Sequence, residues 1–155
     1  MLIHEQVSLP GGVEVDAGMA ALLDALWALG LRTSHSCQGT PVTSADDEAV
    51  ADAYVAFPAL EDALVLFDTA LRAASTEEHL ARIDVSVRFL ARPTRPGVTP
   101  LARGRAVTLE LAPDSTRESG LRGCVRFRSD LVAMVEGALG VLGQDVGDTG
   151  PVIRP

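Results

Sequence analysis

Apolar residues recur along the chain with two different periods, and these periods predict alternating helices and strands. The three- and four-residue spacing of amphipathic helices runs through three segments, 16–29, 58–72 and 129–143. Short segments typical of strands make up most of the rest: Ile3–Leu9, Leu31–His35, Ala53–Phe57, Ile83–Phe89, Val107–Leu111 and Cys124–Arg128. Strands that alternate polar and apolar residues favour a sheet covered on one side. The pattern therefore predicts an α/β (α+β) fold, a two-layer sandwich with a mostly antiparallel sheet and helices on one face.

Residue types at the segment ends support the three helices. Asp16 and Ser129 are helix-capping residues, and Pro58 suits the first position of a helix. Gly30 suits the left-handed position after the first helix, and Gly143 ends the third. The expected buried stripes are Met19, Leu22, Leu23, Leu26 and Leu29; Leu60, Leu64, Phe67 and Leu71; and Leu131, Val135, Leu139 and Leu142.

The length of 155 residues fits one domain, which we expect over residues 1–143. The tail, 144–155, is rich in Gly and Pro and is expected to be flexible. Ala53–Phe57 and Gly123–Phe127 both end in Val-x-Phe and both precede a helix. This similarity suggests an internal pseudo-repeat.

Charge is distributed unevenly along the chain. The net charge is −8, and all 13 basic residues are arginines. Between Arg82 and Arg128, ten arginines accompany four acids, so this block carries +6 and the rest of the chain −14. Two interpretations are open: an anion-binding surface, or a solvated strand face balanced by acidic helices. Nonspecific DNA binding is disfavoured, because phosphate would repel the molecule as a whole.

The composition points to a cytoplasmic protein. The sequence has no apolar run of the roughly 20 residues that a membrane span requires. The N-terminal segment, 1–9, lacks the pattern of a signal peptide. Two cysteines, Cys37 and Cys124, are too few for a disulfide framework, so free thiols are expected.

Chemistry is concentrated at Thr33–Gly39, where the sequence predicts a turn after a strand. Free backbone amides and a permissive glycine could hold an anion or a carbonyl oxygen there. Cys37 is a candidate nucleophile, with His35 as its activator, although neighbours two residues apart on a strand lie ~7 Å from each other. The alternative is a small buried cysteine beside an ordinary turn. The candidate ligand-binding residues of this turn are Ser34, Ser36, Cys37, Gln38 and Gly39.

A second group of candidates comes from strand periodicity. Arg126 and Arg128 share one strand face with Cys124, and Arg88 joins them if its strand is adjacent. Such guanidinium groups could clamp a phosphate or carboxylate, or could pair internally with Asp84 and Glu110 on the same face. Metal-ligand spacing is absent, so no metal site is predicted.

The string Leu29–Gly39 followed by Ala53–Phe57 resembles small uncharacterised bacterial and phage proteins. These share a helix, a G-x-x-T-x-x-S-C-[QE]-G run, a loop and an A-Y-[IV]-x-F strand. A more distant similarity is to the tRNA wybutosine-synthesis methyltransferase family, in which a Ser-Cys-Ser-Gly-Arg run contributes to an S-adenosylmethionine-dependent site. This chain has Gln38 and Thr40 where that family has the second Ser and the Arg. The resemblance covers residues 16–72 and implies a fold and a site location, not the methyltransferase activity.

These observations favour a protein that binds a small molecule or nucleotide, an anionic ligand, at the Ser36–Gly39 turn. One alternative is a nucleotide- or RNA-modifying enzyme that uses His35, Ser36 and Cys37. Another is a non-catalytic interaction module. A homo-oligomer is expected in each case, no membrane partner is expected, and the sequence does not specify a cofactor.

Overall fold

The computed structural model describes residues 4–39, 52–75, 83–89 and 105–149. A hairpin of β1 (Gln6–Leu9) and β2 (Val13–Asp16) comes first and is followed by α1 (Ala20–Ala28). The remaining elements are β3 (His35–Cys37), β4 (Ala53–Phe57), α2 (Leu60–Ser75), β5 (Ile83–Phe89), β6 (Arg105–Pro113), β7 (Leu121–Phe127) and α3 (Val132–Thr149). Single turns of 3₁₀-helix, Ala17–Met19 and Ser129–Leu131, precede α1 and α3.

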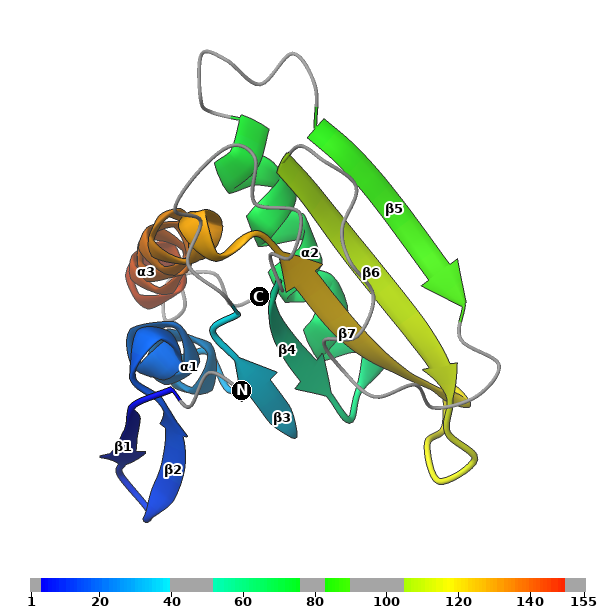
Figure 1. The fold of residues 1–155 in the computed structure, drawn as a ribbon, viewed down its shortest axis with the longest axis horizontal. Helices are drawn as coiled ribbons and strands as arrows, with labels where there is room; N and C mark the ends of the chain where they lie inside the picture. Colours follow the sequence, from blue (N-terminus) through cyan, green and yellow to red (C-terminus); the bar gives the residue numbers. More distant parts are fainter. Residues whose placement is uncertain (1–3, 40–51, 76–82, 90–104, 150–155) are drawn as a thin grey trace.

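Five strands form the main sheet, in the order β3-β4-β7-β6-β5 (Figure 1). All neighbouring strands are antiparallel except β5 and β6, which are parallel. The helices pack on this sheet, and the predicted two-layer α+β sandwich with a mostly antiparallel sheet is confirmed. In the described part of the chain, no helix is both long enough and apolar enough to cross a membrane.

The core lies between the sheet and the helices and is aliphatic with two phenylalanines. Val55, Phe57, Val125 and Phe127 are fully buried on the helix-facing side of the sheet. Helix α2 approaches β7 closely at Gly123, where an added Cβ would lie 2.6 Å from the Cβ of Ala63. Only glycine permits this separation, so the sequence at 123 sets how near α2 lies to the sheet.

The two strands of the suggested pseudo-repeat are neighbours. Strands β4 and β7 pair antiparallel with Val55 opposite Val125, Ala53 opposite Phe127 and Phe57 opposite Gly123. The strands are thus related by a local two-fold axis at the Val55–Val125 pair, and each leads into a helix of the same layer.

Several predicted boundaries were wrong near the N-terminus. Asp16 ends strand β2 and holds the N-cap position of the 3₁₀-turn Ala17–Met19, but its side chain makes no capping hydrogen bond. The hairpin partner β2 was missed, because four residues are too few to show a period. The strand expected at Leu31–His35 is β3, which begins at His35 and ends at Cys37. Cys37 therefore lies on a strand and not in a turn, and Gly39, two residues beyond it, has a φ of +72°.

Helix details also differ from the prediction. The buried face of α2 centres on Ala63, Leu66 and Ala70, whereas Leu64 is 45% exposed. Helix α3 continues through Gly143 to Thr149, because a glycine with room around it does not by itself end a helix that is already packed. Of the predicted flexible tail, residues 144–149 belong to α3, and residues 150–155 lie outside the described part of the chain.

Candidate functional site

A pocket of about 550 Å³ lies against the edge strand β3. Its walls come from the β1–β2 hairpin, α1, the segment that leads into β3, and Tyr54 on β4. Strand β3 pairs with β4 on one side only, so its other edge faces the hairpin across this space. The predicted site residues Ser34 and Ser36 line the pocket, together with His35.

The wall around Ser34 is held by hydrogen bonds from both its backbone and its side chain. The Ser34 amide donates to the Ala56 carbonyl at 2.8 Å, and its hydroxyl donates to the same oxygen at 3.2 Å. The indole N–H of Trp27 donates to Thr33 Oγ1 at 3.0 Å. The Arg32 amide donates to Asp62 Oδ2 at 3.0 Å and so ties this segment to α2. These contacts give the pocket a preformed shape.

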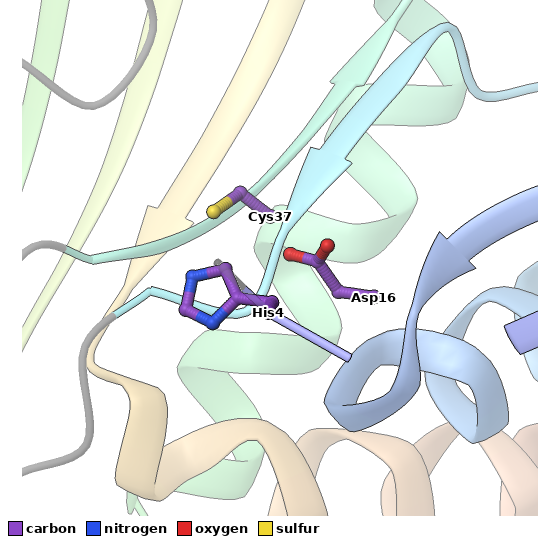
Figure 2. Close-up of side chains that lie close together, drawn as sticks. All are labelled: His4, Asp16 and Cys37. Carbon is purple, nitrogen blue, oxygen red and sulfur yellow. The ribbon is translucent and has the colours of Figure 1, made fainter. Parts of the chain in front are cut away.

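At the end of β3, side chains from three separate segments converge beside the pocket. His4, Asp16 and Cys37 present ligand-type atoms that all lie within 4.8 Å of one another (Figure 2). Asp16 also lines the pocket, so the cluster and the pocket share a wall. Sequence reasoning missed His4 and Asp16, because only the hairpin brings them to Cys37.

Gln38 organises this cluster. Its backbone amide donates to Asp16 Oδ2 at 3.0 Å, and its side-chain oxygen accepts from the Gly18 amide at 2.8 Å. Its side-chain nitrogen lies 3.0 Å from His4 Nδ1. Because the Gly18 contact fixes which end of the amide is oxygen, Gln38 donates to His4. The other Asp16 oxygen accepts from Gln6 Nε2.

The side chains of His4, Asp16 and Cys37 are all of types that ligate divalent transition metals such as zinc. However, the imidazole of a metal ligand donates its second N–H to an acceptor, whereas His4 Nδ1 accepts from Gln38. Both Asp16 oxygens also already accept hydrogen bonds. The described contacts therefore favour a closed hydrogen-bonded network at this position over a metal centre.

The surroundings of Cys37 disfavour its thiolate form. Burial raises the pKa of Cys37, and the Asp16 carboxylate raises it further, while the Gly39 amide, 3.5 Å from Sγ, and Arg126 oppose this. Burial alone raises the pKa of Cys124 to about 12. Reactive cysteines are found in electropositive surroundings that lower the pKa, so the geometry lends no support to nucleophilic catalysis by Cys37.

We expect both thiols to alkylate slowly in the folded protein. At pH 7.5, iodoacetamide should modify Cys37 and Cys124 at least about tenfold more slowly than in the urea-unfolded chain, because the thiolate is disfavoured and partly shielded. Peptide mapping by mass spectrometry gives both rates in one sample. A Cys37 rate above that of the unfolded chain would contradict this account.

Polar residues run across the sheet on the face opposite the core. The strand register places Cys37, Tyr54, Arg126, Thr108 and Ser86 side by side from β3 to β5, and we call this the polar row. Ser86 Oγ and Thr108 Oγ1 are 2.8 Å apart, as expected for residues on one face. Arg126 forms an ion pair with Glu110, and its Cζ atom lies 5.0 Å from the centroid of the Tyr54 ring.

The three predicted arginines do not form one clamp. The Arg126 side chain is 6% exposed and that of Glu110 3%, so this pair is the internal alternative that the sequence left open. Arg128 follows β7 and pairs with Asp130 at 3.2 Å. Arg88 is exposed on β5. None of these arginines lines the pocket beside β3, whereas Arg32 does.

Asp52, which precedes β4, is a functional candidate that the sequence analysis missed. It is 3% exposed, and no described residue donates a hydrogen bond to either carboxylate oxygen. Burial raises the pKa of Asp52 to about 7, and Arg126 and Arg128 only partly oppose this. The one signal in the sequence was an acid directly before a strand of buried residues.

We compared the chain with family models, with curated proteins and with solved structures, and none matches it. The resemblance of residues 16–72 to bacterial and phage proteins therefore stays a prediction. The features that bear on function are therefore a preformed pocket and a partly buried polar row in a two-layer α+β protein.

Proposed function

We propose that this protein binds a small molecule in the pocket between the β1–β2 hairpin, α1 and β3. The observation that carries the proposal is the pocket itself, whose volume of about 550 Å³ is within the range of ligand sites. Polar and charged residues outnumber apolar residues in its walls, and this composition favours a polar ligand whose groups can form hydrogen bonds there.

The charges of the lining residues refine the ligand class. Carboxylates at Glu14 and Asp16 and the guanidinium of Arg32 line the pocket. Hydroxyl or ammonium groups of a ligand would donate to the carboxylates, and an anionic group would meet Arg32. The proposed ligand is therefore a small polar molecule that carries donors, with at most one anionic group. The indole of Trp27 offers the apolar contact for the rest of it.

The test compares small molecules bound to the purified parent protein and to a variant with a filled pocket. Ser36→Phe places a large side chain in the lining, so we expect it to lose any molecule that native mass spectrometry finds on the parent. Glu14→Gln is a milder variant at an exposed position and should weaken binding of an added hydroxylated or cationic metabolite by about tenfold, the effect of one charge-assisted hydrogen bond.

Ser115→Phe is the matched control, because Ser115 is exposed in the turn between β6 and β7, outside the pocket lining. Equal retention of the molecule by Ser36→Phe and Ser115→Phe would refute the proposal. So would the absence of any thermal shift across a library of polar metabolites.

A second candidate function is an enzyme that uses general acid–base chemistry on a nucleotide or RNA, and the specific observation in its favour is Asp52. A buried carboxyl with a pKa of about 7 can take up or release a proton near neutral pH. Turnover of a bound molecule by the parent, but not by Asp52→Asn, would favour this function over simple binding.

A further inference from the structure

Strand β5 leaves an apolar surface at the edge of the sheet. It is the last strand in the sheet order, and it pairs only with β6 among the described strands. Val85, Val87 and Phe89 are 50%, 60% and 62% exposed, among the highest values for the large apolar residues of the described part of the chain. In Figure 1, β5 forms the outer rim of the sheet, on the side away from α1 and α3. An exposed edge of this kind is a template for pairing with another strand.

We infer that β5 pairs with β5 of a second copy of this chain, in an antiparallel register centred on Ser86. The sequence of the strand, Ile-Asp-Val-Ser-Val-Arg-Phe, is self-complementary about its central serine. A two-fold axis through the two Ser86 residues places Asp84 of each copy opposite Arg88 of the other. It also places Val85 opposite Val87, and Ile83 opposite Phe89.

The pairing matches charge with charge and apolar with apolar residues. Directly opposed residues of antiparallel strands have Cβ atoms ~4.5–5.5 Å apart, close enough for ion pairs and apolar contacts across the two strands. Since the register is symmetric, the dimer contains two acid–base pairs, each with Asp84 from one copy and Arg88 from the other. On the other face of the sheet, Val85 of each copy contacts Val87 of the other. A closed two-fold interface of this kind ends the assembly at a dimer.

Other symmetric registers pair fewer residues of β5. Centring the axis on Val87 places Arg88 opposite Ser86 and moves Asp84 out of the paired strand. Centring it on Val85 places Asp84 opposite Ser86 and moves both Arg88 and Phe89 out of the paired strand. Only the register about Ser86 keeps the whole of β5, Ile83–Phe89, within the pairing. The charge pattern therefore selects a second copy as the occupant of this edge.

The experiment is sedimentation equilibrium of the full chain and of charge variants of β5. The parent is expected to be a dimer at micromolar concentrations. In Arg88→Asp, Asp84 of each copy lies opposite an aspartate of the other copy, so repulsion replaces both ion pairs. This variant should raise the dissociation constant of the dimer at least about tenfold. The double variant Asp84→Arg/Arg88→Asp restores an acid–base pair in the same register and should return the constant to within about threefold of the parent.

Arg117→Asp controls for net charge, because it makes the same charge change in the exposed turn between β6 and β7. Circular dichroism shows that each variant is folded. A parent that stays monomeric at every concentration would overturn the inference, as would a dimer that Arg88→Asp leaves unchanged. Failure of the double variant to restore the dimer would overturn the register about Ser86. None of these outcomes depends on whether the pocket beside β3 binds a ligand.

Discussion

Replacing Arg126 by methionine is expected to lower the free energy of unfolding by about 3–5 kcal/mol. Arg126 and Glu110 form an ion pair in which both side chains are almost completely buried. Removing the guanidinium leaves the Glu110 carboxylate at 3% exposure without its counter-charge, and a buried unpaired charge is strongly destabilising. Loss of the contact with the Tyr54 ring adds a smaller amount. Urea denaturation, followed by circular dichroism, measures the difference.

Two controls separate the unpaired charge from the loss of a large side chain. The double variant Arg126→Met/Glu110→Leu removes both charges and should recover most of the stability, because an apolar pair of similar size costs no desolvation. Arg117→Met removes an exposed arginine that lies 3.9 Å from Asp114, and should change the unfolding free energy by less than about 1 kcal/mol. If the double variant were as unstable as the single one, packing rather than charge would explain the loss.

Asp52 is expected to make the protein less stable as the pH rises from 5 to 8. Its pKa is about 7 in the folded protein against an ordinary value of 3.8, so the folded state binds this proton more tightly than the unfolded chain. The stabilisation from the protonated carboxyl is complete below pH 3.8 and is lost as the pH rises through 7. Its size is on the order of 2–4 kcal/mol, because each tenfold difference in proton affinity between the two states contributes about 1.4 kcal/mol.

Asp52→Asn removes the titrating group while keeping its shape. We expect this variant to be more stable than the parent at pH 8 and to lose most of the slope of the unfolding free energy between pH 5 and 8. Asp114→Asn is the control: hydrogen bonds from Thr116 lower the pKa of Asp114, so its contribution is lost only below pH 3.8. A parent whose stability rises from pH 5 to 8 would show that Asp52 is paired when ionised.

The period-two pattern was enough to predict most of the sheet. Ala53–Phe57 and Ile83–Phe89 were predicted with the bounds that β4 and β5 have. The same pattern placed Arg126 and Glu110 on the face away from the core, where they pair. It could not show that β5 lies at an edge, since strand order depends on pairing between distant segments. The alternation alone therefore favoured a buried Val87, whereas this residue is 60% exposed.

The candidate site was predictable only in part. Ser34, Ser36 and Cys37 were singled out by the density of polar side chains in one short segment, and they do adjoin the pocket and its cluster. Their partners could not be found in this way, because His4 and Asp16 reach Cys37 through the fold of a hairpin with four-residue strands. Asp52 was missed for a different reason: a raised pKa depends on burial, and burial is a property of the folded chain.

The position of Gln38 has a practical consequence for ligand screening. This residue joins the first turn after the hairpin, through Gly18, to His4 near the start of the chain. The backbone amide of Gln38 also donates to Asp16, which lines the cavity, so a bulky affinity tag fused directly ahead of His4 is expected to disturb the contacts of this wall. Proteins prepared for such work should carry the tag at the other terminus, or have it removed by a protease before compounds are added.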